Sequence, residues 1–265
     1  MFRSIIYFQL CLFCFISCYE PVDGCLDPDA KNYNVTADND CSGCCQLPQV
    51  RIVFTYLYNG NSFNLGDTLS SGSELIKLND FHFYLSNISV VNDAGANIYL
   101  EDSVRIEETN GNVYFVGDDY RYFDRQRFSA NLDGLRYSGT LTSLEFDVGI
   151  PESYNLYNVD SLRINSMLGT IPTDAYIQGS GFIFFSFDIE FIKREVQSID
   201  LINSFPLTAV SLDLEGISVE RAKDVSVSLI FDVGKAISGI SGDFSSDENG
   251  KVIKNNIAMA FSQKI

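Results

Sequence analysis

The sequence predicts an all-β protein: an antiparallel β-sandwich or barrel-like domain with a short C-terminal helix, preceded by a small disulfide-rich segment. Two stretches, 144–150 and 225–233, show the period-two alternation of a strand buried on one face. Strands do not alternate with helices along the chain, so a parallel βα fold is not expected. Helical spacing of apolar residues is clear only near the end, at Ile253, Ile257, Ala260 and Phe261.

Further strands are expected in chain order at 50–58 before an Asn-Gly turn, at 79–91 before Asn-Asp-Ala-Gly, and at 113–116, 182–192 and 207–214. Within 79–91 the apolar residues lie first on odd positions and then on even ones. One extra residue near Ser86-Asn87 would restore a single buried face. We therefore expect a β-bulge or a bend there.

Residues 1–17 have the features of a lipoprotein signal peptide. They carry Arg3 as their one charge, an apolar run at 5–16, and Ser17 directly before Cys18. The run is too short to span a bilayer as a helix, and lipoprotein signal peptidase requires a small residue before the cysteine. We expect an acylated Cys18 that anchors the protein in a bacterial cell envelope, in the outer membrane on its periplasmic or surface face. The alternative is an ordinary cleaved signal peptide with a coincidental cysteine.

The predicted organisation is therefore a signal peptide (1–17), a lipid-anchored cysteine-rich segment and linker (18–48), and a β-domain (49–265). The cysteine-rich segment contains Cys25, Cys41, Cys44 and Cys45. An even number of cysteines in a short exported segment predicts two disulfides. A bridge between the adjacent Cys44 and Cys45 is sterically poor, so each is expected to pair with Cys25 or Cys41. A four-thiolate zinc site is the alternative, but only Cys41 and Cys44 have knuckle spacing.

Oxygen-bearing side chains in the same segment raise the question of calcium. The stretch GCLDPDAKNYNVTADNDCSGCC resembles a small module that recurs in exported proteins of Gram-negative bacteria. Asp38, Asn39 and Asp40 could coordinate calcium through oxygen. A solvated turn that closes the disulfide loop is the favoured interpretation of these residues.

The charge of the chain excludes one class of function. Removal of residues 1–17 deletes Arg3 and leaves 17 basic against 35 acidic residues, a net charge near −18. Such a surface repels nucleic acid, whose recognition depends on Lys and Arg at the phosphates. No nucleic-acid partner is expected, and the lipid anchor is the expected contact with a membrane.

Several short motifs occur in an order that resembles the methanobactin-associated periplasmic copper-binding family, the MbnP-like proteins. The first is Phe-x-Phe-Tyr-Leu-Ser-Asn-Ile at 81–88, and the second is Leu-x-Phe-x-Val-Gly-Ile-Pro at 144–151. GSGFIFFSFDIEF, DVSVSLIFD and a terminal NNIAMAF follow in order. The resemblance covers nearly all of residues 49–265 and implies a β-rich fold.

The resemblance also implies copper, which the residues of this chain disfavour. Copper in the family is associated with histidines and with a tryptophan oxidised to kynurenine. This chain has no tryptophan, and Tyr176 and Gln178 lie roughly where the family's tryptophans would fall. His82 is the single histidine, and a structural or surface role is favoured over ligation. The residues assign no cofactor, and calcium is compatible with the carboxylates.

No pattern indicates an enzyme. Ser nucleophiles lack a histidine partner that the sequence can place, and no phosphate loop follows a strand. Asp118 and Asp119, with Tyr120 and Tyr122, could line a ligand groove, although a long loop between strands has the same composition.

Two hypotheses of different classes remain. The first is an envelope binding or accessory protein whose family copper site is degenerate and whose metal, if any, is held weakly through oxygen. The second is a lipid-anchored interaction module that docks an envelope partner, such as the diheme peroxidase-type proteins that accompany this family. The sequence does not give the oligomeric state.

Overall fold

We analysed a computed structural model of the chain. It describes residues 19–41, 43–100, 103–107, 110–117, 120–132, 134–151, 176–177, 181–192, 196–202 and 207–265. The chain divides into two compact units, Met1–Gln46 and Leu47–Ile265. The leader and Cys18 lie outside the described residues. Among the described residues, no helix has the length and apolar character needed to cross a membrane.

The first unit is held by two disulfides and a minimal sheet. Cys25 is bridged to Cys45 and Cys41 to Cys44, with Cα atoms 5.0 and 5.6 Å apart. These separations lie within the range that disulfides require. The strands β1 (Asp23–Gly24) and β2 (Asn39–Asp40) pair in parallel beside them. The prediction that Cys44 and Cys45 pair with the two earlier cysteines is confirmed.

The second unit consists mainly of strands. In chain order they are β3 (Val50–Leu57), β4 (Thr68–Ser71), β5 (Glu74–Asn92), β6 (Asn97–Tyr99), β7 (Ser103–Glu107), β8 (Val113–Gly117), β9 (Arg121–Asp124), β10 (Ser129–Leu132), β11 (Gly139–Val148), β12 (Tyr176–Ile177), β13 (Gly181–Phe191), β14 (Val196–Ile202), β15 (Thr208–Val219), β16 (Val225–Asp232) and β17 (Phe261–Gln263). The predicted all-β class is confirmed, and the predicted strand at 225–233 ends one residue early.

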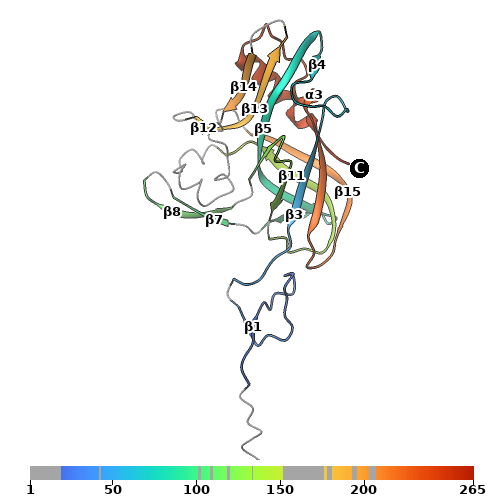
Figure 1. Ribbon diagram of the computed structural model, residues 1–265. Helices are drawn as coiled ribbons and strands as arrows, with labels where there is room; N and C mark the ends of the chain where they lie inside the picture. The colour runs from blue at the N-terminus through green and yellow to red at the C-terminus, as the bar shows by residue number, and fades with distance from the viewer. Residues whose placement is uncertain are drawn as a thin grey trace, which may run out of the picture. The chain divides into compact units, whose positions relative to one another are not determined.

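Two sheets form the sandwich. The smaller has the order β10-β3-β16-β17, and the larger has β12-β13-β5-β11-β15 with β4, β6, β9 and β14 attached. The long strand β5 organises the larger sheet: β13 pairs with its first half and β11 with its second (Figure 1). A separate hairpin pairs β7 with β8.

The predicted bulge in β5 is confirmed. Glu145 lies opposite Ser89, whereas Asp147 lies opposite Ser86, so the step from Glu145 to Asp147 faces one additional residue of β5. Asn87, inside this step, has a φ of 51°, a left-handed conformation that asparagine tolerates better than most residues. The extra residue turns the apolar positions on both sides of the bulge toward the same core.

One strand pair departs from the predicted antiparallel pattern. β3 and β16 pair in parallel over their whole length, with Val50 opposite Val225 and Leu57 opposite Asp232. A half-buried strand shows the same period-two alternation in either direction, so the pattern could not reveal the orientation. The other pairs between named strands in the second unit are antiparallel among the described residues.

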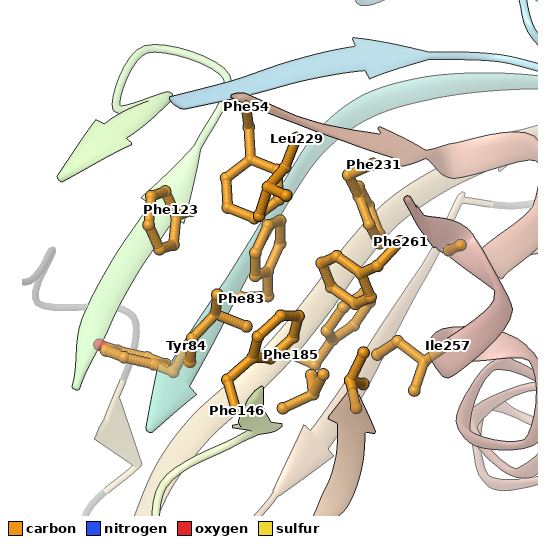
Figure 2. Packing of buried hydrophobic residues seen from close by; sticks show 14 of the residues in the cluster. Phe54, Phe83, Tyr84, Phe123, Phe146, Phe185, Leu229, Phe231, Ile257 and Phe261 are labelled. Carbon is orange, nitrogen blue, oxygen red and sulfur yellow. The ribbon is translucent and has the colours of Figure 1, made fainter. Parts of the chain in front are cut away.

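Aromatic rings fill the space between the two sheets (Figure 2). The Phe83 ring of β5 lies 5.4 Å from Phe54 of β3 and 4.8 Å from Phe231 of β16. Phe231 in turn lies 4.8 Å from Phe261 of β17. Such pairs stabilise a core beyond the apolar area that they bury. These contacts connect strands from the beginning of the domain's sequence with strands from its end.

The C-terminal helix α4 (Ser246–Asn256) begins with a capping box in which Ser245 and Glu248 bond each other's backbone N–H groups. A 3₁₀ turn, η4 (Ile257–Ala260), follows the helix. The prediction that Phe261 continues the helix is wrong, because Phe261 begins β17 and pairs opposite Phe231. The pattern of a short apolar run does not by itself distinguish helix from strand.

The carboxylate of Asp232 joins the ends of β3 and β16. It is 3% exposed and accepts hydrogen bonds from the N–H groups of Asn59 (2.8 Å) and Gly60 (2.9 Å) in the predicted turn after β3. It also caps α3 (Val233–Ala236) by accepting from the Lys235 N–H. One buried side chain therefore fixes a turn and a helix start.

Candidate functional site

The carboxylates proposed for calcium in the first unit are occupied by local hydrogen bonds. The Tyr19 hydroxyl and the Val22 N–H donate to Asp38, and together they hold the pKa of the Asp38 carboxyl below its usual range. The Leu26 N–H donates to Asp40 at 3.2 Å. Both carboxylates therefore organise the loop, in agreement with the favoured interpretation as a turn.

His82 lies on β5, on the sheet face opposite the core. Cross-strand register places Ser186 of β13 and Asp124 of β9 opposite it. Its ring is half-buried and lies 5.4 Å from the ring of Tyr122. The neighbouring Phe81 and Phe83 point into the core, which fixes His82 on the outer face.

A groove of about 540 Å³ opens beside His82 over β5, β13 and β14. Its polar lining comes from one face of these three adjacent strands: Asp80, His82, Ser186, Asp188, Ser198 and Asp200. Asp200 accepts hydrogen bonds from the hydroxyls of Ser186 (2.6 Å) and Ser198 (3.0 Å). The groove thus combines three carboxylates, two hydroxyls and one imidazole.

The arrangement of the carboxylates determines what the groove attracts. Asp80 and Asp188 are directly opposite each other on antiparallel strands. Like charges in this relation destabilise a sheet, and a cation between them would relieve the repulsion. Oxygen donors of this kind suit hard divalent cations such as calcium or magnesium.

The same donor set does not fit copper. The chain offers one imidazole, and a copper site of the kind that the resemblance implies needs more than one nitrogen ligand. Met259 is 64% exposed on η4, and Met167 lies outside the described residues. No group of three or more His, Cys, Asp or Glu side chains in the described part of the chain is placed to hold a metal ion.

Of the four residues proposed to line a ligand groove at 118–122, the structure describes the two tyrosines. Asp118 and Asp119 lie outside the described residues. Tyr120 is 1% exposed, so its ring is not a surface platform. Tyr122 is half-buried between the His82 ring and the Arg127 guanidinium, which lies 5.3 Å from its ring. The structure therefore places Tyr122 beside the His82 ring but not among the residues that line the groove, and it places Tyr120 in the core.

Sequence reasoning missed the carboxylates of the groove, although a signal for them exists. Ser186 and Asp188 alternate with Phe185, Phe187 and Ile189 on β13, and Ser198 and Asp200 alternate with Ile199 and Leu201 on β14. On β5, Asp80 and His82 flank the buried Phe81. Period two places such residues on the outer face of each strand. The pairing of these strands, which brings the polar faces together, is not contained in that pattern.

Comparisons with known proteins bear on the second unit. The family model of MbnP matches residues 48–257. Among solved structures, MbnP from Methylosinus trichosporium is similar in fold, with 12% sequence identity, a TM-score of 0.43, and coverage of 71% of this chain and 76% of that chain. No curated protein matches the sequence. Because the family match extends over well more than half of the sequence, the chain belongs to the MbnP family.

Proposed function

We propose that this chain is a lipid-anchored binding protein of the bacterial envelope, in which an oxygen-rich groove has replaced the copper site associated with the family. The observation that carries the proposal is the donor set beside His82. Two opposed aspartates, a third aspartate, two hydroxyls and one imidazole line the same groove, and no three of the acidic or imidazole groups are gathered into a metal cluster there. This set favours weak binding of a hard divalent cation over tight binding of copper.

The location rests on separate features. Ser17-Cys18 after a short apolar run supports lipidation, and disulfides are typical of an oxidising compartment. The groove and the anchor lie in different parts of the sequence and are tested by separate experiments.

Elemental analysis of the protein, purified from its own envelope, tests the metal. We expect no stoichiometric copper after a mild chelator, and saturable, weak binding of calcium or magnesium on titration. Asp188→Asn should weaken the binding about tenfold or more, because it removes one of the two opposed charges. Asp213→Asn, at an exposed position on β15, is the matched control and should leave the affinity unchanged.

Copper that survives the chelator would contradict the proposal and restore the function of the family to this chain. Absence of any cation binding would favour the alternative, an interaction module that docks an envelope protein of the diheme peroxidase type. Co-purification of such a partner with the anchored protein would then be the deciding measurement.

A further inference from the structure

A second pocket, of about 310 Å³, lies where the pairing along one edge of β3 is interrupted. It shares no lining residue with the groove beside His82. Four consecutive residues of β3, 54–57, line it together with Phe63 and Arg125 from flanking loops. Consecutive strand residues point their side chains to opposite faces of the sheet. What these four share is the peptide edge of the strand, so the pocket lies along that edge.

The pocket is bounded at both ends by backbone hydrogen bonds. On one side, β10 pairs with β3 as far as Val53, and the Phe54 N–H donates to the Phe128 carbonyl at 2.7 Å. On the other side, Tyr58 and Asn61 exchange both backbone hydrogen bonds, at 2.7 and 3.1 Å. The edge is therefore paired at Phe54 and again at Tyr58, and open between them.

The backbone of Tyr56 faces this opening. Alternate residues of a strand direct their N–H and C=O groups to the same edge, so Tyr56 shares the direction of Phe54 and Tyr58. The other edge belongs to β16, as shown by the Gln49 carbonyl, which accepts from the Val225 N–H at 2.9 Å. Among the described residues, no strand residue is registered opposite Tyr56 on its open side. The backbone N–H and C=O groups of Tyr56 therefore face the pocket, as the donor and acceptor of an unpaired strand edge do.

Positive charge adjoins the opening. The Arg125 guanidinium is half-buried 5.4 Å from the ring centre of Phe63, and its Nη2 donates to the Phe63 carbonyl at 3.1 Å. Lys264 Nζ donates to the hydroxyl of Thr55, one of the lining residues, at 3.1 Å. Within the described part of the chain, no carboxylate lies within ion-pair distance of either cation. In a chain with 35 acidic and 18 basic residues, two such cations beside one pocket are a distinct electrostatic feature.

We propose that this pocket binds an N-acylated amino acid, either free or as the C-terminal residue of a peptide. The ligand amide pairs with the backbone of Tyr56 and fills the gap in the ladder. The ligand carboxylate accepts from Arg125, which has donors beyond the one given to Phe63. The volume lies at the lower end of that of small-molecule sites, which suits a ligand of this size.

A second copy of the chain does not suit this position. Symmetric pairing of two β3 edges would bring the two Arg125 side chains to the same seam, where like charges repel. The bounded gap also admits about three residues of extended chain between Phe54 and Tyr58, which is too short for a stable strand pair.

Nuclear magnetic resonance of the full chain in detergent tests the proposal, with N-acetyl-L-leucine as the first probe and acetyl-Ala-Ala-Leu as the second. We expect a saturable shift of the Tyr56 amide and slower exchange of its hydrogen. The Thr55 amide, which faces β16, should keep its exchange rate. Tighter binding of the peptide would assign the site to a peptide C-terminus, and equal binding would assign it to the free compound.

Two comparisons test the contact between the ligand carboxylate and Arg125. The methyl ester of N-acetyl-L-leucine lacks the negative charge. Its affinity for the unaltered protein should be lower by a factor of about ten or more. Arg125→Gln should lose a similar factor, whereas Arg127→Gln, an exposed arginine two residues away, should bind normally. No saturable shift with either probe, an ester as tight as the acid, or binding without protection of the Tyr56 amide would overturn the proposal.

Discussion

Replacement of Asp232 by alanine should destabilise the second unit strongly, because one buried carboxylate holds three backbone N–H groups. Loss of a helix N-cap costs about 1 kcal/mol. Each of the two shorter hydrogen bonds, to Asn59 and Gly60, involves a charged acceptor and contributes about 1.5 kcal/mol. The free energy of unfolding should therefore fall by about 4 kcal/mol, with a drop in melting temperature of about 10 °C for a unit of this size.

Urea denaturation followed by circular dichroism is the suitable assay, because the midpoint should shift while the slope stays constant. Asp232→Asn retains an uncharged acceptor and should lose about half as much as alanine. The exposed Asp213 on β15 provides the control, and its alanine variant should stay within about 0.5 kcal/mol of the unaltered protein. A loss below about 1 kcal/mol in Asp232→Ala would refute the view that this carboxylate holds the two ends together.

Three further predictions concern other parts of the chain. Tyr56→Phe should leave the free energy of unfolding unchanged or raise it by about 1 kcal/mol, because the hydroxyl is buried without a hydrogen-bond partner among the described residues. Tyr58→Phe should lower the free energy of unfolding by about 1 kcal/mol, because it removes the 2.9 Å hydrogen bond to the Ser70 carbonyl. Thermal unfolding of the two variants checks this prediction. Cys18→Ala should move the protein from membranes to the soluble envelope fraction, and a variant that stays with the membranes would contradict the lipid anchor. Thiol titration of the unfolded, unreduced protein should find no free thiol within 25–45, and two or more free thiols would argue for a metal or redox role.

Tyr56 on β3 and Tyr58 just after it both have hydroxyl pKa values raised by burial. Burial raises the pKa of the Tyr56 hydroxyl far above its usual range, and the charge of Asp124 adds to this effect. Burial likewise raises the pKa of Tyr58, with Asp232 as the contributing charge. Both hydroxyls therefore keep their protons at neutral pH, so the comparison of the two variants reports hydrogen bonding and not ionisation.

Local patterns were sufficient to predict the strands β3, β5, β8, β11, β13, β15 and β16 and the bulge in β5, but they did not predict the strands β4, β6, β7, β9, β10, β12, β14 and β17. The change of apolar phase between Leu85 and Ile88 located the bulge at Asn87, because a buried face leaves few alternatives for the register. The even number of cysteines in a short segment predicted two disulfides, and steric limits on neighbouring cysteines excluded a Cys44–Cys45 bridge but left the other two pairings open. Each of these features depends on residues close to one another in sequence.

Features that depend on distant residues were not predictable in the same way. The pairing of Asp80 with Asp188 joins two strands whose separate patterns carry no information about each other. Tyr120 and Tyr122 look equivalent in the sequence, yet one is in the core and the other lies beside His82. The position of Arg125 at the β3 opening depends on where β10 stops pairing, which its composition does not indicate.

The parallel pairing of β3 with β16 has a consequence for how the protein is made. Gln49 and Asp224, which bond each other at the start of this pair, are 175 residues apart in the sequence. The smaller sheet therefore lacks its central strand pair until nearly the whole chain is available, and contacts of such long range form slowly. Until β16 is available, the edge of β3 that it covers stays unpaired, and an unpaired strand edge is a site at which chains associate wrongly.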